Sequence, residues 1–173
     1  MLAPMNLAPT NPPAMHLAEL NIAHLRAPAD SPELAEFIAL LEPVNAVADT
    51  APGFVWRLKE SESDPTALVV HDYGDHLVTN FSVWESLESL WNYAYRSEHL
   101  AVLRRRREWF LRMAEPYMVM WWVPAGEIPT LAEGMRRLER LRSEGPGPEA
   151  FTFKDAYDSS EAVSLPAAAA ARK

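Results

Sequence analysis

The order in which strand-like and helix-like apolar patterns follow one another restricts the fold of this chain more than any other feature. Residues 15–25 (MHLAELNIAHL) alternate as a strand does. The sequence DSPE at residues 30–33 then supplies an N-cap, a proline for the first helical position and an acid for the first turn. We expect a helix from there to just before Pro52, with a kink or break at Pro43.

The middle of the chain predicts a hairpin followed by a long helical region. Residues 54–58 and 76–84 have the composition of strands, separated by the polar turn ESESDPT and a possible strand extension at residues 67–71. Residues 85–113 are helical in composition, and Ser97 is a plausible cap for a second helical piece.

The last third predicts one more strand and one more helix. Residues 117–123 (YMVMWWV) are typical of a strand that is buried on both faces. Residues 130–133 (TLAE) match a capping box, and the helix that they open is expected to stop at Gly145. Residues 150–153 could add a short edge strand.

Strand, helix, strand, strand, helix, strand, with an extra helix behind, is the order of a ferredoxin-like α+β fold. In that fold a split βαβ arrangement gives one antiparallel sheet with helices on one face. The other face is then expected to be bare, and residues such as Val55, Val78 or Trp121 would lie on it. A second copy of the chain is the simplest cover for such a face, so we expect a homodimer.

Length and composition predict one folded domain between two tails. The chain has 173 residues, of which 49% are hydrophobic, too many for a disordered protein. We expect a disordered N-terminal tail at residues 1–14, where four prolines interrupt the sequence, a domain at 15–154 and a flexible C-terminal tail at 155–173. The N-terminus does not resemble a signal peptide, which makes a cytoplasmic protein the default expectation.

Charge and missing motifs argue against several classes of function. Sixteen basic and twenty-four acidic residues give a net charge of −8, which disfavours nucleic acid and anionic membranes as partners. The chain has no cysteine and no HxH or HExxH spacing, so we expect no metal site, although His71 and His76 flank a turn whose Asp72 and Asp75 could help to capture a metal by accident. It also lacks a nucleophile elbow, a phosphate-binding glycine loop and a dinucleotide fingerprint, which argues against hydrolases, kinases and nicotinamide enzymes.

Residues 95–126 gather the strongest candidates for a functional site. Large aromatics beside a lone histidine and an arginine are typical of a small-molecule pocket, but also of a core with a satisfied polar edge. Trp91, Tyr95 and His99 are four residues apart and share one face of an unbroken helix. In the functional interpretation His99 transfers a proton and Tyr95 supports it. In the structural interpretation the three residues form a buried aromatic stripe.

The other candidates are an arginine, two asparagines and further tryptophans. Of the four consecutive arginines at residues 104–107, Arg106 is expected to point inward and to pair with Glu133 or with an acidic ligand. Asn21 and Asn80 lie on strands that should be neighbours, where they either tie down a bulge or orient a substrate. Further candidates for walls of the pocket are Trp56, Trp91, Trp109 and Trp122.

Several segments together resemble a known family. They read, in chain order, LAELNIA, PVNAVAD, PGFVWRL, NFSVWES, YRSEHLAVLRRRREWF, WWVPAGEIPT, RRLERL and GPGPEAFTF. The chain is identified by them as resembling the domain-of-unknown-function family 3291, which is similar to the dimeric α+β barrel proteins. These include small antibiotic-biosynthesis monooxygenases, haem-degrading monooxygenases and chlorite-dismutase relatives. The resemblance implies a homodimer whose two sheets face each other, with a pocket between sheet and helices in each subunit.

The resemblance also implies a type of chemistry. The leading hypothesis is a small-molecule tailoring enzyme of secondary metabolism, either a cofactor-independent monooxygenase or a proton-transfer isomerase or cyclase, acting on an apolar aromatic substrate. His99 would take the proton with support from Tyr95, and Asn21, Asn80 and Arg106 would stabilise the developing charge. No cofactor is expected. The alternatives are a haem-binding protein with His99 as axial ligand, and a non-catalytic ligand-binding dimer in which Tyr95 and His99 have no cavity beside them.

Overall fold

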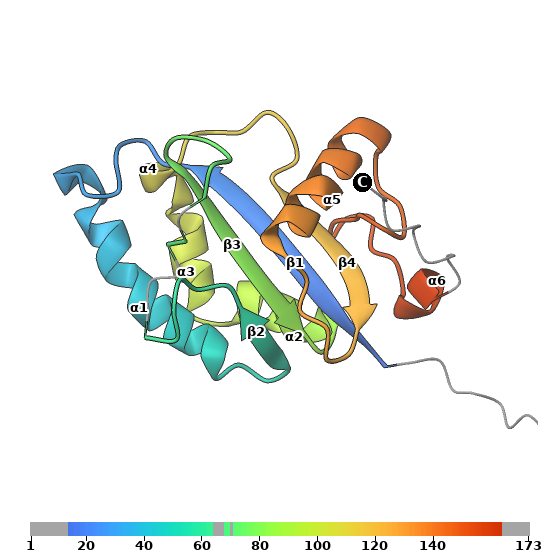
Figure 1. The fold of residues 1–173 in the computed structure, drawn as a ribbon. Coiled ribbons are helices and arrows are strands. Elements are labelled where there is room, and N and C mark those ends of the chain that lie inside the picture. Colours follow the sequence, from blue (N-terminus) through green and yellow to red (C-terminus); the bar gives the residue numbers. More distant parts are fainter. Residues whose placement is uncertain (1–13, 64–67, 70, 164–173) are drawn as a thin grey trace, which may run out of the picture.

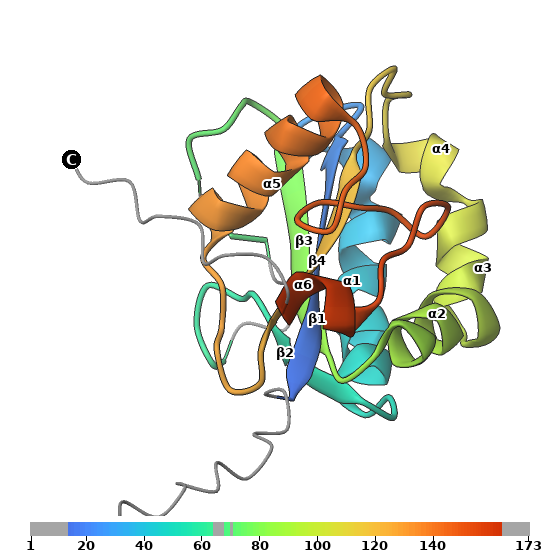
Figure 2. The same ribbon diagram turned by 90° about the vertical axis from the view of Figure 1, so that its right-hand side faces the viewer.

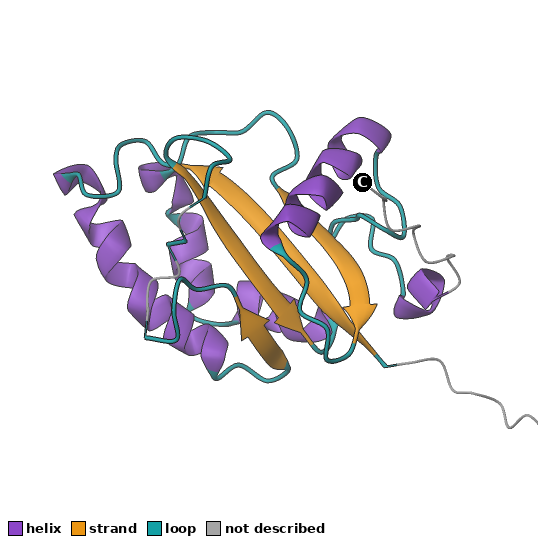
Figure 3. Cartoon of the chain, viewed as in Figure 1, coloured by secondary structure: helices purple, strands orange, loops and turns teal. Residues whose placement is uncertain are grey.

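The computed structural model describes residues 14–63, 68–69 and 71–163, and these contain a four-stranded antiparallel sheet (Figures 1 and 3). The strands are β1 (Met15–His24), β2 (Phe54–Arg57), β3 (Leu77–Trp84) and β4 (Met118–Pro124). Their order in the sheet is β2-β3-β1-β4, with every neighbouring pair antiparallel. This is the strand order of a ferredoxin-like fold, so the predicted fold class is confirmed.

Helices cover both faces of the sheet (Figures 1 and 2). One face carries a short 3₁₀ turn and four helices, namely η1 (Pro32–Leu34), α1 (Ala35–Asp49), α2 (Leu87–Arg96), α3 (His99–Arg104) and α4 (Arg106–Trp109). The opposite face carries α5 (Leu131–Glu144). Side chains alternate along β1, so Leu17, Glu19 and Asn21 point to the four-helix side, and Ala18, Leu20 and Ile22 belong to the core under α5.

Helix α1 runs through Pro43 without interruption, so of the predicted kink or break the break does not occur. A proline removes the hydrogen bond to the carbonyl four residues earlier, which here belongs to Ala39. Both Pro43 and Ala39 are exposed, so water can bond to the freed carbonyl and the helix can continue.

The helical region at residues 85–113 is divided into three helices where two were expected. Ser97 ends α2, and its hydroxyl accepts a hydrogen bond from the backbone N–H of His99 at 3.1 Å, but the N-cap of α3 is Glu98, one residue after the predicted cap. A further turn at Arg105 separates α3 from α4. The break at Ser97 places His99 at the first turn of a new helix, so Trp91, Tyr95 and His99 do not share one helical face.

Helix α5 packs on the β1 and β4 part of the sheet face that was expected to be bare. The helix begins at the predicted cap, where Thr130 accepts a hydrogen bond from the Glu133 N–H at 3.2 Å. Its Gly134 lies directly against Leu20 and Trp121, and Trp121 is completely buried. Val78 lies on the other face, because it pairs with Ala23 and packs with the core beneath α1.

The remaining predictions concern the edges and ends of the domain. Residues 150–153 make two isolated bridges, Phe151 with Met120 and Ala150 with Gly147, and no full strand. The described residues among 67–71 form no strand either. Residues 155–163, expected in a flexible tail, include α6 (Ser159–Val163), and the carbonyl of Tyr157 accepts a hydrogen bond from the Trp122 indole at 2.8 Å. Most of the predicted N-terminal tail and residues 164–173 lie outside the described residues. Across the described part of the chain, none of the helices has the length and apolar character to cross a membrane.

Candidate functional site

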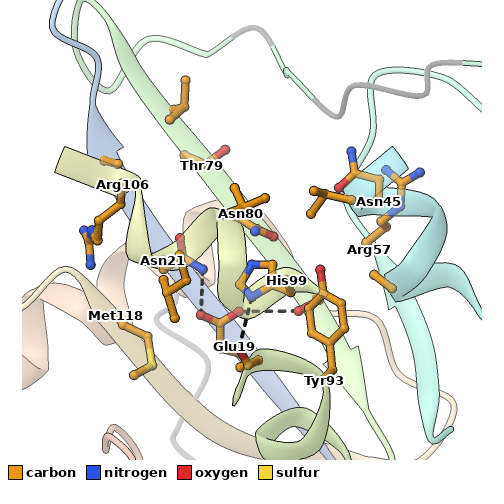
Figure 4. A pocket seen from close by; sticks show the side chains of 18 of the residues that line it. Glu19, Asn21, Asn45, Arg57, Thr79, Asn80, Tyr93, His99, Arg106 and Met118 are labelled. Carbon is orange, nitrogen blue, oxygen red and sulfur yellow. Dashed lines mark hydrogen bonds between the residues drawn. The ribbon is translucent and has the colours of Figure 1, made fainter. Parts of the chain in front are cut away.

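A cavity of about 240 Å³ lies between the sheet and the helices α1 to α4 (Figure 4). Its floor is the face of β1 and β3 that carries Glu19, Asn21, Asn80 and Ser82. Much of its wall is apolar and comes from α1, α3 and the chain after α4, with Phe37, Leu40, Leu41, Val44, Leu103 and Phe110. An apolar cavity with a few converging polar groups is the usual form of a small-molecule site.

Glu19 is the only carboxyl group among the described residues that line the cavity. Its side chain is 6% exposed on the central strand β1. Burial raises the pKa of Glu19 to about 7, although hydrogen bonds from Asn21 and Ser82 act in the opposite direction. A carboxyl group with this pKa exists in both protonation states near neutral pH, so it can take and return a proton.

A short chain of hydrogen bonds holds the Glu19 carboxyl in place. The Asn21 amide donates to one carboxyl oxygen at 2.8 Å, and the Ser82 hydroxyl approaches the other at 3.4 Å (Figure 4). The Ser82 oxygen in turn accepts a hydrogen bond from the Trp84 indole at 2.9 Å. The orientation of Glu19 is therefore fixed by β1 and β3 together.

His99 enters the cavity from the first turn of α3. Its ring nitrogen Nδ1 lies 3.3 Å from the carbonyl of Ala94, and a carbonyl only accepts, so Nδ1 carries the hydrogen. Burial lowers the pKa of His99, and this backbone hydrogen bond offsets part of that effect. The ring is therefore neutral at pH 7, and its Nε2 is free to accept a hydrogen bond or a proton from a ligand.

Two tyrosines flank His99 in different ways. Tyr93 stacks between the rings of Trp84 and His99, with centroid distances of 5.0 Å and 4.8 Å. Burial raises the pKa of Tyr93, so its hydroxyl stays protonated. Tyr95 also lines the cavity, burial raises its pKa, and its ring contacts Trp91 and Phe153. The non-catalytic alternative predicted no cavity beside Tyr95 and His99, so the cavity that both residues line counts against it.

Asn21 and Asn80 are direct cross-strand partners, as their predicted strands required. Both line the cavity (Figure 4). The Asn21 amide is engaged with Glu19, whereas Asn80 is exposed and its amide has no hydrogen-bond partner within the described ranges. Asn80 is thus available to a ligand, and Asn21 serves Glu19.

Arg106 and Arg57 lie on opposite sides of Glu19 and Asn80 in Figure 4. Arg106 donates to the Tyr117 hydroxyl at 2.5 Å and does not meet Glu133, which pairs with Arg137 at 2.9 Å on the other side of the sheet. Arg57, 9% exposed, is held by both oxygens of Asp49 at 2.7 Å and 3.2 Å. Its Nη1 is buried without a hydrogen-bond partner.

Four tryptophans expected as walls do not line the cavity. Trp56 points to the α5 side and packs edge-on against Phe81, because a bulge in β2 leaves Phe54 and Arg57 on the cavity side. Trp109 is buried in the core beneath α1, and Trp122 packs toward Phe151 and Tyr157. Trp91 is 42% exposed, because α2 turns that side outward. The indole that does line the cavity is that of Trp84.

Sequence reasoning missed Glu19, although a signal for it exists. In LAELNIA, Glu19 and Asn21 are the only polar residues, and each lies between two small or apolar residues of the same strand. A charged residue in the middle of a central strand is rarely buried without a function or a partner. Arg57, Ser82 and Tyr93 gave no such signal, because their positions in the cavity depend on the register of β2 and β3 and on the break at Ser97.

The family assignment can be made at this point. The family model for a domain of unknown function, DUF3291, matches residues 16–166. The chain belongs to this family. The resemblance predicted from the sequence segments is therefore confirmed, but the description of the family assigns no activity.

Two solved structures show similarity to the chain at low levels. SnoaB, a cofactor-independent oxygenase from Streptomyces nogalater, is 17% identical with a TM-score of 0.45, and the match covers 68% of this chain and 98% of that one. A protein of unknown function from Nitrosomonas europaea is 15% identical with a TM-score of 0.40, covering 68% and 97%. No curated protein matches the sequence. The function has to be argued from the cavity itself.

Proposed function

We propose that the protein is a small-molecule enzyme that removes a proton from an apolar aromatic substrate bound in the cavity. The observation that carries the proposal is Glu19, a buried carboxyl group whose pKa of about 7 lies near physiological pH. A general base works best when its pKa is close to the operating pH. A strongly perturbed carboxyl group inside a cavity is also a common mark of an active site.

Glu19 is assigned the role of proton acceptor, which sequence reasoning gave to His99. Asn21 and Ser82 hold the Glu19 carboxyl, and the free amide of Asn80 donates to the oxygen on which negative charge develops. His99, neutral and with Nε2 open, accepts a hydrogen bond from a hydroxyl of the substrate. Tyr95 lines the cavity beside it as a neutral donor.

Proton removal from carbon next to a carbonyl, or from a phenol, leaves an enolate or phenolate. Return of the proton to a different carbon completes an isomerisation. Attack of the carbanion on dioxygen leads to oxygenation without a cofactor, the other branch of the hypothesis. Both branches begin with the same proton transfer to Glu19, so the first test addresses that step.

The test uses 2-tetralone, a bicyclic ketone with acidic C–H bonds, in D₂O. Wild-type protein is expected to accelerate deuterium uptake at these carbons, followed by NMR, and an oxygen electrode reports the oxygenation branch. Glu19→Gln keeps the shape of the side chain and should lower the rate at least about 100-fold, since removing a general base costs roughly 10²- to 10⁴-fold. His99→Ala should lower it about 10-fold.

Glu42→Gln is the matched control, because Glu42 is an exposed acid on α1 that does not line the cavity. Its rate should equal that of the wild type. The proposal fails if the wild type does not accelerate exchange, or if Glu19→Gln exchanges as fast as the Glu42→Gln control.

The proposal that the protein forms a homodimer rests on the family resemblance alone. The residues of one chain already form the cavity described above. Native mass spectrometry should show the mass of two chains.

Haem binding through His99 is kept as the second candidate, because a backbone carbonyl holds its Nδ1–H and leaves Nε2 as the nitrogen that could bind a metal, as in many metal-bound histidines. Titration with haemin tests it. A Soret band that is lost in His99→Ala would support it, and no spectral change at stoichiometric haemin would remove it.

A further inference from the structure

Arg106 differs from the other sheltered arginines of this protein in lacking a carboxylate. Within the described residues, Arg57, Arg105, Arg137 and Arg142 are also buried or partly buried, and each has an acid within 4.0 Å. Arg106 has no carboxylate at that distance in the described part of the chain, and the acid proposed for it from sequence, Glu133, lies on the other side of the sheet. A partly buried cation without a counter-charge is costly, which calls for an external partner.

Tyr117 holds Arg106 in one orientation. One guanidinium nitrogen, Nη1, donates to the Tyr117 hydroxyl at 2.5 Å. The guanidinium carbon also lies 4.3 Å from the centre of the Tyr117 ring. Arginine has five N–H donors in a rigid fork, and this contact uses only one of them. The group is therefore ordered in advance while most of its donors are unused.

The unused donors belong to a residue that lines the cavity. Arg106 lies at one end of it, and Asn80 and Glu19 lie between Arg106 and Arg57 (Figure 4). Next to Arg106 in the lining are Leu103 and Phe110, which offer surface to an apolar molecule. A ligand seated on this wall would have its polar end at Arg106 and its body over Glu19.

We propose that Arg106 is the anion-binding subsite of the cavity, and that the substrate is an apolar aromatic carboxylic acid whose carboxylate pairs with the Arg106 guanidinium. This inference rests on the proposed function and defines its substrate class. Arg57 differs from Arg106 because Asp49 supplies its counter-charge through two of its nitrogens, although its Nη1 has no hydrogen-bond partner in the described part of the chain.

A permanent anion fits Arg106 better than a transient one. Arginine is charged at every physiological pH, so its need for a counter-charge exists before any reaction starts. An enolate that forms only during catalysis leaves that need unmet in the ground state. Arg106 is therefore a binding residue in this proposal, and Asn80 is the donor to developing charge.

Two ligands of the same shape separate charge from apolar contact. 2-Naphthoate carries a carboxylate where 2-naphthamide carries a neutral amide, and both are compared by isothermal titration calorimetry at low salt. Wild-type protein should bind 2-naphthoate at least about 10-fold more tightly, because a charge-assisted hydrogen bond contributes about 1.5–3 kcal/mol, and about 1.4 kcal/mol is tenfold. Equal affinities, or no binding of either ligand, would overturn the inference.

Arg106→Gln should abolish the preference, with a loss of about 10- to 100-fold for 2-naphthoate and no change for 2-naphthamide. Arg107→Gln is the matched control, because Arg107 is the exposed neighbour on α4 and the net charge changes equally. An equal loss in Arg107→Gln would overturn the inference in favour of a general charge effect. Should Arg106→Gln not fold, Arg106→Lys is expected to lose a few-fold for 2-naphthoate only, and an unchanged affinity there would count against the subsite.

Glu19→Gln separates this inference from the proposed function. It should retain the preference for 2-naphthoate while losing deuterium exchange. If the wild type prefers 2-naphthoate but does not accelerate deuterium exchange, the anion-binding subsite is supported and the proposed enzyme function is contradicted. If it accelerates exchange but shows no preference for 2-naphthoate, the enzyme function is supported and the subsite is contradicted.

Discussion

The Glu19 side chain is buried on the central strand β1, and this burial couples the ionisation of its carboxyl group to folding. In an unfolded chain its carboxyl group has an ordinary pKa of 4.5, and in the folded protein burial raises this to about 7. Between these two values the unfolded state releases the proton while the folded state keeps it. The contribution to stability is therefore complete below pH 4.5, falls as the pH rises to 7, and stays low above that.

We predict that Glu19→Gln stabilises the protein at alkaline pH. Glutamine has no charge to bury, so the gain should reach about 3 kcal/mol at pH 8 and shrink toward zero as the pH falls to 4.5. Urea denaturation at pH 5 and pH 8 measures the gain at each pH. A gain that is the same at both pH values would show that ionisation of Glu19 is not its source.

Arg57 and Asp49 form the pair on which the other end of the cavity depends. We predict that Asp49→Asn destabilises the protein by about 3 kcal/mol, because it leaves the buried Arg57 guanidinium without a counter-charge. Asp75→Asn, in an exposed loop, is the control and should stay within about 0.5 kcal/mol. A loss below about 1 kcal/mol for Asp49→Asn in thermal or urea unfolding would mean that Arg57 finds another partner or water.

At this scale the sequence predicted some residues of the candidate site and not others. Asn21, Asn80, Tyr95, His99 and Arg106 line the cavity, and their polar or aromatic character within apolar segments was the signal. The tryptophans were misplaced because an indole fills a core as readily as a pocket. A side chain of that size carries no information about which face it occupies until the strand register is known.

At the scale of elements, the way α5 lies on the sheet depends on one small residue. A Cβ at Gly134 would lie 2.9 Å from Leu20 Cδ2 and 3.2 Å from Trp121 Cη2, both in fully buried side chains. The glycine therefore lets the helix approach the sheet closely over β1 and β4.

We predict that Gly134→Val destabilises the protein by about 1–3 kcal/mol through overpacking. Ala132→Val, at an exposed position on the same helix, is the control and should cost only the small helix-propensity difference, about 0.5 kcal/mol. Thermal unfolding of both variants gives the comparison. Equal effects would show that α5 does not pack tightly on the sheet.

Most elements were predictable, and the errors have specific causes. Thr130 marked the start of α5 correctly, because its hydroxyl accepts a hydrogen bond from a local N–H, whereas Ser97 lies one residue before the N-cap of α3. The break at Pro43 was wrong, because solvent access to the Ala39 carbonyl depends on tertiary structure. The position of α5 was not foreseen, since the pattern of a helix shows its apolar side but not the surface that it covers.

At the scale of the whole molecule, we expect the activity of the cavity not to depend on whether the chain forms a dimer. The cavity lies between the sheet and the helices α1 to α4, and α5 packs on the opposite face against β1 and β4. We therefore predict that the exchange rate per chain is unchanged by dilution, even if native mass spectrometry shows two chains at high concentration. A rate per chain that falls as the dimer dissociates would mean that the partner contributes to the site.

The most direct test of the central claim is the pH dependence of deuterium exchange at 2-tetralone. A base must be deprotonated to act, so the rate should rise with pH through the pKa of the acting group. With Glu19 as the base, the midpoint of the rise in exchange rate should lie near pH 7 in the wild type. The His99→Ala variant should exchange more slowly with the same midpoint, and the rise should be absent in Glu19→Gln. A midpoint below 6.5 that survives in Glu19→Gln and disappears in His99→Ala would contradict the claim and assign the proton transfer to the histidine.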